Sequence, residues 1–192
     1  MLDPLLLDLP AFIETERLRL RPPQPGDGPV LFEAIEESLA ELRAFLAWLP
    51  WVAAEPSVAL SESWCRNSHA NFLARKDLPF LIFEKSTELL VGASGLHRPV
   101  WETPKVEVGY WVRTSRRGNG MIAEAVSALT QYAFNYLGAV RVELVTDEAN
   151  ARARKVAERC EFLLEGTLRN ERRAPDKKLR NTCIYARLRK EP

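Results

Sequence analysis

Residues 106–122 read Val-Glu-Val-Gly-Tyr-Trp-Val-Arg-Thr-Ser-Arg-Arg-Gly-Asn-Gly-Met-Ile, and this stretch is the most informative part of the chain. It begins as a strand-like run, and an amphipathic helix opens near Asn119. Gly118 and Gly120 let the backbone approach a ligand closely and take dihedral angles that a β-carbon forbids. The first turn of the following helix presents unpaired N–H groups and a positive dipole end. The stretch therefore predicts a phosphate-binding loop, to which neighbouring arginines add positive charge.

Length and charge limit the kind of protein. The chain has 192 residues, 46% of them hydrophobic, which is enough for one domain over residues 1–192 with a proper core. Lysine and arginine number 27 against 26 aspartate and glutamate residues, so the formal net charge is +1. Such a chain has no general attraction for nucleic acid or membranes, and we expect neither as a partner. Leu5–Leu7 is too short and lacks the basic flank of a signal peptide.

The cysteines and histidines argue against disulfides and against a metal site. Cys65, Cys160 and Cys183 are odd in number and widely spaced, which is typical of reduced thiols in a cytoplasmic protein. His69 and His97 stand apart, outside any ligand spacing, so we expect no zinc.

Periodicity and turn signals predict a mixed α/β fold with hairpin-like, antiparallel strands before the loop. Those earlier elements are a strand at Thr15–Arg21, a helix capped by Asp27 and running past Leu42, a break at Trp48–Trp51, a helix from Ser57 to about Lys76, and strands at Leu78–Glu84, Leu89–Leu96 and Pro104–Val112. The later ones are a helix from Asn119 to the capping Gly138, a strand at Val140–Thr146, a helix at Ala149–Cys160, and strands at Phe162–Leu168 and Thr182–Leu188 joined by a charged loop around Pro175 and Asp176.

The glycines also fit a dinucleotide-binding fingerprint. Gly118, Gly120 and Ala123 match G-x-G-x-x-A, and Glu143 follows at about 20 residues, as that fold requires. We reject this interpretation because Arg113–Arg117 separate the strand from the glycines, whereas a dinucleotide-binding fold turns directly from strand into glycine. The chain beyond the loop is also too short for repeated β-α-β halves. A basic loop that binds nothing remains the plain alternative.

Several motifs in the right order over nearly the whole chain resemble the GNAT acetyltransferases, and more narrowly their RimJ/RimL subgroup, which acetylates N-termini of ribosomal proteins. In chain order these motifs are Thr15–Arg21 (TERLRLR), Leu49-Pro50-Trp51, Glu107–Val112 (EVGYWV), Ser115–Gly120 (SRRGNG), Glu124-Ala125, Asn150 with Val156–Arg159 (VAER), Phe162–Gly166 (FLLEG) and Tyr185.

The resemblance implies a central, mostly antiparallel sheet that splays where acetyl-CoA binds, with flanking helices. The pantetheine arm would lie between the splayed strands and the pyrophosphate on the glycine loop. A backbone N–H on the strand could polarise the thioester carbonyl. The residues implied to bind acetyl-CoA are Tyr110, Trp111, Val112, Arg117, Gly118, Asn119, Gly120, Met121, Ile122 and Asn150.

Acetyl transfer needs a neutral amine, and the resemblance places a candidate base at Glu165. An α-amino group has an ordinary pKa of about 7.7–8.0 and needs less help than lysine, at about 10.4. The alternatives are a merely solvated Glu165, or Glu107 or Glu102 as the base. The family often has Asn-x-x-Ser at the start of this helix, whereas this chain has Asn150-Ala-Arg-Ala153. Either water or a neighbour such as Tyr185 would replace the missing hydroxyl, or protonation of the departing thiolate matters little.

Of the tryptophans near the expected acceptor site, Trp51 is the candidate for lining it, with core packing as the alternative. The leading hypothesis is direct acetyl transfer to a protein N-terminus within a ternary complex, since no cysteine has a paired histidine. A small-amine acetyltransferase, acting on a polyamine or an aminoglycoside, and a non-catalytic acyl-CoA-binding module stay open. A homodimer through the C-terminal strands is also implied.

Overall fold

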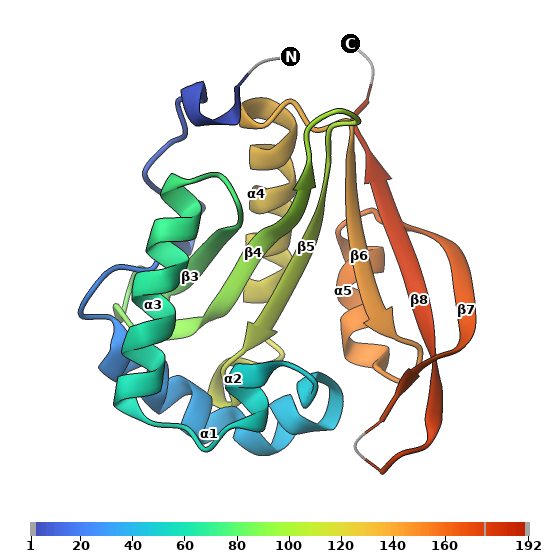
Figure 1. Cartoon of the computed structure of the whole chain (residues 1–192), viewed down its shortest axis with the longest axis horizontal. Helices are drawn as coiled ribbons and strands as arrows, with labels where there is room; N and C mark the ends of the chain where they lie inside the picture. The colour runs from blue at the N-terminus through green and yellow to red at the C-terminus, as the bar shows by residue number, and fades with distance from the viewer. Residues whose placement is uncertain (1–2, 175, 191–192) are drawn as a thin grey trace.

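A computed structural model describes residues 3–174 and 176–190, and it contains one sheet with helices on both faces (Figure 1). The strand order is β1-β2-β3-β4-β5-β6-β8-β7, antiparallel throughout except for the parallel pair β5 and β6. The strands are β1 (Ile13–Glu14), β2 (Leu18–Arg21), β3 (Leu78–Glu84), β4 (Leu90–Val100), β5 (Lys105–Val112), β6 (Arg141–Asp147), β7 (Leu163–Arg173) and β8 (Leu179–Leu188). The mostly antiparallel α/β fold predicted from sequence is confirmed.

The helices form two layers because each has one apolar stripe that must be buried against the sheet. They are α1 (Gly28–Leu46), α2 (Pro50–Ala53), α3 (Val58–Leu73), α4 (Met121–Tyr136) and α5 (Ala151–Arg159), with short 3-10 turns at Pro4–Leu6 and at Thr114–Arg116, which is η2. In Figure 1, α1, α2 and α3 lie in front of the sheet, while α4 and α5 lie behind it. Among the described residues, no helix combines the length and the apolar character that crossing a membrane requires.

The first predicted strand is shorter than expected. Instead of running through Thr15–Arg21, the chain forms β1, turns, and pairs back on itself as β2, with Ile13 opposite Leu20. The turn is closed by a hydrogen bond from the Thr15 N–H to the Leu18 carbonyl at 2.9 Å. The predicted alternation is confirmed for Leu18 and Leu20, whose side chains are both fully buried.

Asp27 occupies the predicted start of α1 but does not cap it. Its carboxylate instead accepts two hydrogen bonds from Arg21, at 2.6 and 2.7 Å, and one from the Gln24 N–H at 2.7 Å. The ion pair wins because a bidentate guanidinium–carboxylate contact in a half-buried place is stronger than a neutral cap bond. Ser57, in contrast, caps α3 by accepting from the Leu60 N–H at 3.1 Å.

The pairing between β5 and β6 is brief. It covers only Lys105–Glu107 against Arg141–Glu143, after which the two strands diverge (Figure 1). On its other edge β5 stays paired with β4 as far as Val112. Beyond Glu107, one edge of β5 therefore has no strand partner in the described part of the chain.

The C-terminal hairpin is longer than predicted. β7 continues to Arg173 and β8 begins at Leu179, so most of the expected charged loop is strand. Asp176 stays in the turn and accepts from the Lys178 N–H at 3.1 Å, while Pro175 lies outside the described residues. Mutual pairing of two strands satisfies their backbone groups, which allows charged residues to extend a hairpin that hydrophobic alternation alone would end earlier.

Candidate functional site

The glycine loop leads directly into α4. Gly118 and Gly120 have φ angles of +80° and +74°, and Gly120 occupies the N-cap position before Met121. Both angles lie in the left-handed region, where a β-carbon is strained. Within the described residues, the backbone N–H groups from Gly118 to Ala123 have no hydrogen-bond acceptor. The predicted cradle of open N–H groups at a helix start is therefore present.

The arginines around this loop are already paired with carboxylates. Arg113 contacts Glu37 at 2.5 Å and Arg117 contacts Glu41 at 2.8 Å, both carboxylates belonging to α1. The hydrogen bond from Arg117 holds the pKa of Glu41 below its usual range. The arginines thus connect the loop to α1. The groups of the loop that stay free to bind an anion are its open backbone N–H groups.

The turn between β1 and β2 makes a second set of contacts with the loop and α4. Arg17 donates to the Glu124 carboxylate at 2.7 Å and to the Asn119 carbonyl at 2.9 Å. Thr15 donates to the same carboxylate at 2.5 Å. Burial raises the pKa of Glu124, but these hydrogen bonds outweigh it and leave the pKa below its usual range. Asn119 is consequently held with its carbonyl turned to Arg17.

The end of β5 places its residues on alternate faces. Tyr110 packs towards α4 and α5, and its hydroxyl donates to the Ala153 carbonyl at 3.2 Å. Trp111 packs on the opposite face, among α1, α2 and α3. Val112 belongs with Tyr110 to the cluster behind the sheet. The open edge of β5 leads to the open N–H groups at the start of α4. An extended ligand with a pyrophosphate at one end requires this order.

The start of α5 differs in detail from the expectation. Asn150 caps the helix, its Oδ1 accepting from the Ala153 N–H at 3.1 Å. Tyr185 is buried, and its hydroxyl accepts from Arg154 Nε at 3.1 Å. The hydroxyl brought to position 153 is that of Tyr110, whose pKa is raised by burial so that it stays protonated. Sequence could not reveal this contact because it joins two elements across the splay.

Glu165 lies in a bulge of β7 and is engaged by Arg141. The two form a bidentate ion pair with distances of 2.8 and 2.5 Å, and Arg141 also donates to Glu143 at 2.8 Å. The hydrogen bonds from Arg141 hold the pKa of Glu165 below its usual range. Because Arg141 and Glu143 alternate with the buried Val142, all three charges lie on the sheet face away from α4 and α5.

The same face carries a histidine–aspartate pair, of which the sequence analysis considered only His97, as a zinc ligand. His97 Nδ1 lies 2.7 Å from Asp77 Oδ1. The imidazole lies over Gly95 and Gly109, where a β-carbon would come within 2.7 and 3.0 Å of the ring. These glycines are opposite each other on β4 and β5, so the sheet leaves space there for the ring. Gly95 and Gly109 were the only feature of the sequence that could have indicated this position of the His97 ring. Within the described residues, no group of three or more potential ligands could hold a metal ion.

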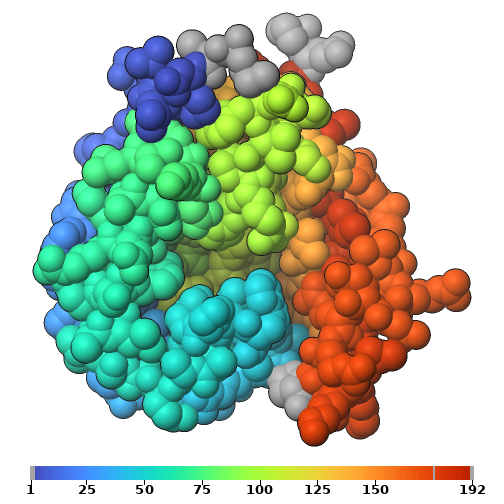
Figure 2. Space-filling model, in the orientation of Figure 1, coloured from blue at the N-terminus to red at the C-terminus, as the bar shows by residue number. Residues whose placement is uncertain are grey.

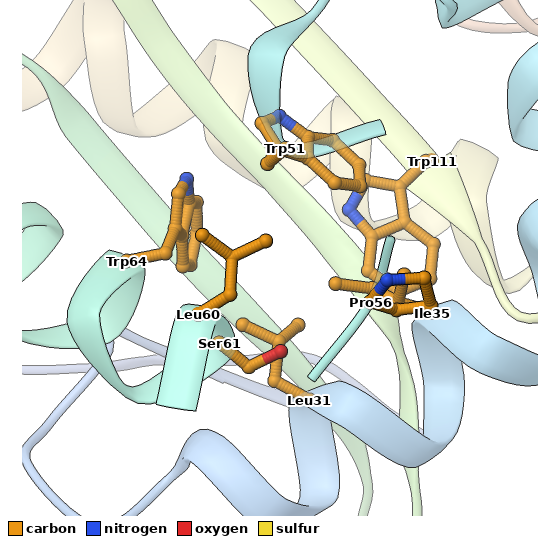
Figure 3. Close-up of a pocket in the computed structure, with 8 residues that line it drawn as sticks. All are labelled: Leu31, Ile35, Trp51, Pro56, Leu60, Ser61, Trp64 and Trp111. Carbon is orange, nitrogen blue, oxygen red and sulfur yellow. The ribbon is translucent and has the colours of Figure 1, made fainter. Parts of the chain in front are cut away.

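An apolar pocket opens beside the end of β5. It is a small recess open to solvent, in which the centre of a water molecule has about 20 Å³. Trp51 and Trp111 form one wall, with ring centroids 6.0 Å apart, and Trp64 lies on α3 (Figure 3). The other lining residues are Leu31, Ile35, Pro56, Leu60 and Ser61. Figure 2 shows the surface hollowed in the middle of this face, between α3, α2, the β4–β5 segment and the later strands.

These features define a class: a transferase fold that lays an extended acyl thioester between two diverging strands and its pyrophosphate on a helix start. The sequence matches the family described as "Acetyltransferase (GNAT) domain" over residues 17–163. The chain therefore belongs to the GNAT acetyltransferases, which are acetyl-CoA-dependent N-acetyltransferases. The open β5 edge and the free N–H cradle fit that co-substrate.

Three known proteins illustrate the similarity. A Bacillus subtilis (strain 168) protein provisionally named ribosomal N-acetyltransferase YdaF is 37% identical over 81 residues, covering 42% of this chain and 44% of that relative. The match thus spans less than half of that relative. The structure of RimL, the ribosomal L7/L12 α-N-protein acetyltransferase, in complex with coenzyme A has a TM-score of 0.84 at 20% identity, covering 92% of this chain and 97% of that one. The microcin C7 self-immunity acetyltransferase MccE, in complex with acetyl-CoA and AMP, has a TM-score of 0.81 at 20% identity, covering 91% and 94%. The two structures share the fold with this chain.

Proposed function

We propose that the protein acetylates the α-amino group of a protein N-terminus, as the RimL-like relatives are named for doing to ribosomal proteins. The observation that carries the proposal is the divergence of β5 from β6 next to the open N–H groups of Gly118–Ala123. Together they offer an extended channel that ends in an anion cradle. A cytoplasmic location would follow from such an acceptor, and a homodimer through the C-terminal strands is part of the same proposal.

The backbone groups of Tyr110 and Val112, on either side of Trp111, would hold the pantetheine amides. The open N–H groups from Gly118 to Ile122 would hold the pyrophosphate, whereas the Arg117 N–H donates to the Thr114 carbonyl at 3.4 Å. Bound acetyl-CoA supplies the activated acetyl group, and free CoA leaves. A backbone N–H at the end of β5 would stabilise negative charge developing on the acetyl oxygen. Asn150 would act through the α5 start that it caps.

Two proton movements accompany the exchange of a C–S bond for a C–N bond. Glu165 would accept the proton of the acceptor amine, directly or through water, which requires its ion pair with Arg141 to open or to share the carboxylate. Tyr110 is a candidate to donate a proton to the departing sulfur, since its hydroxyl lies 3.2 Å from the carbonyl of Ala153, the position where relatives often have serine. Trp51 would line the acceptor side.

An N-terminal amine is favoured over lysine or a polyamine because much of it is neutral near pH 8. A polycationic acceptor would also need carboxylates in the pocket, and all eight residues named as lining it are uncharged.

Turnover with an acceptor panel tests the proposal. Free CoA should be released with peptides that have a free N-terminus, and not with N-acetylated copies or with polyamines and aminoglycosides. Acetylation of small amines alone would make the protein a small-amine acetyltransferase. Tight acetyl-CoA binding without turnover on any amine would make it an acyl-CoA-binding module.

A further inference from the structure

The pocket between α1, α3 and β5 is a place for an apolar side chain. Its walls are the rings of Trp51, Trp64 and Trp111 with aliphatic groups between them, and Ser61 contributes the one hydroxyl among the lining residues (Figure 3). The space inside it that the centre of a water molecule can reach is about 20 Å³, so the pocket is a small recess that opens to solvent. It suits one side chain better than a large antibiotic.

The pocket is joined to the reaction channel through Trp111. This residue belongs to the end of β5, where the edge towards β6 is open, and it lies between Tyr110 and Val112, whose backbone groups would hold the pantetheine. An α-amino group and the side chain of its own residue share one carbon atom. A first residue whose side chain enters the pocket would therefore bring its amine close to the end of β5.

We infer that the pocket selects acceptors whose first residue is aliphatic or aromatic, such as leucine or phenylalanine; this rests on the proposed N-terminal acetylation. Burying a large apolar side chain removes it from water and stacks it against the indoles. A first serine would place its hydroxyl in an almost wholly apolar site and lose water hydrogen bonds. A charged first residue would meet no opposite charge among the lining residues.

The experiment compares peptides that differ only in the first residue: leucine, phenylalanine, alanine, serine and lysine. CoA release gives kcat/KM for each. We expect leucine or phenylalanine to exceed serine and alanine by on the order of tenfold or more, the discrimination an apolar pocket can supply.

Matched variants test whether the pocket causes the preference for an apolar first residue. Trp51→Ala should remove most of it, whereas Trp48→Ala should leave it intact, because Trp48 is 66% exposed and lies outside the pocket on the same segment. Leu60→Lys adds a charge at the rim, where the leucine is 36% exposed, and should lower kcat/KM for the leucine peptide more than for alanine. CoA affinity, measured by calorimetry, should stay unchanged in all three variants and reports that they are folded.

The outcomes separate the two proposals. Equal kcat/KM for all first residues, or a preference that survives both Trp51→Ala and Leu60→Lys, would overturn the pocket assignment and leave N-terminal acetylation standing. No acetylation of any peptide by a protein that binds CoA would overturn the activity and the pocket assignment with it.

Discussion

Glu165 is the residue on which the proposed chemistry depends most. Replacing it with glutamine keeps the size of the side chain and a hydrogen-bond acceptor for Arg141 but removes the base. General-base catalysis typically contributes about 10²–10⁴-fold, so Glu165→Gln should lower kcat by roughly 100-fold or more with little change in CoA affinity. Steady-state kinetics and calorimetry measure the two effects.

Glu161→Gln is the matched control, because Glu161 forms an exposed ion pair with Arg187 at 2.6 Å just before β7. Its kcat should match that of the parent protein. An unchanged rate in Glu165→Gln would remove Glu165 from the mechanism. A large loss in His97→Gln in that case would assign the role to His97 and Asp77.

The pH dependence follows from the direction of the Glu165 pKa. Hydrogen bonds from Arg141 lower that pKa, so the carboxylate is ionised at every pH above the ordinary pKa of a glutamate. The acceptor amine, which must lose its proton, then controls the rate. We expect kcat/KM to rise with pH and to level off near the ordinary pKa of an α-amino group, about 8. A kcat/KM that does not change with pH across this range would contradict the expectation.

At the scale of elements, the start of α4 carries the cofactor assignment. Gly120→Val places a branched side chain at a φ of +74°, with its β-carbon 3.7 Å from Arg17 Nη2, and crowds the cradle. We expect CoA affinity to fall tenfold or more, and stability to fall by about 1–2 kcal/mol from the left-handed backbone.

Gly138→Val is the control at the other end of the same helix. Gly138 has a φ of +65° and open space where a β-carbon would stand, so the strain is similar but the cradle is untouched. Thermal unfolding should show comparable destabilisation, with CoA affinity preserved in this variant alone. Equal affinity for CoA in both variants would contradict the loop assignment.

Arg17 links two elements that are far apart in sequence. It binds the first turn of α4 through Glu124 and the loop through the Asn119 carbonyl. Arg17→Ala should therefore weaken CoA binding several-fold by loosening the cradle. Arg19→Ala removes an exposed ion pair between β2 and Glu14 of β1 and should leave binding unchanged. Calorimetry with CoA distinguishes the two, and identical affinities would show that the linkage has no part in binding.

Periodicity located most of the helices and strands because apolar spacing directly reflects which face is buried. It did not locate α2, which is a single turn started by Pro50, or the turn between β1 and β2. The turn contains Thr15 and Arg17, whose contacts with Glu124 of α4 no local sequence pattern reveals. The open N–H groups of the loop were predictable, since two close glycines before an amphipathic helix create them by geometry alone.

For the whole molecule, the buried thiols give a direct test of packing. Cys65, Cys160 and Cys183 are free and essentially inaccessible to solvent. Burial raises the pKa of the Cys65 thiol to about 12, which keeps it in the unreactive protonated form. A thiol reagent such as DTNB should therefore modify none of them rapidly in the native protein and all three in guanidinium. Rapid labelling of one native thiol would show that its surroundings open readily.

The sequence by itself determined most of the element order, the α/β class and the open N–H groups before α4, because these follow from local spacing and from backbone freedom at Gly118 and Gly120. Only the tertiary structure decided which side chains meet. It paired Glu165 with Arg141, brought Tyr110 to Ala153, seated His97 over two glycines and gathered three tryptophans into one pocket. These contacts join residues on different strands and helices, so they depend on the register of the sheet and on the packing of helices across it.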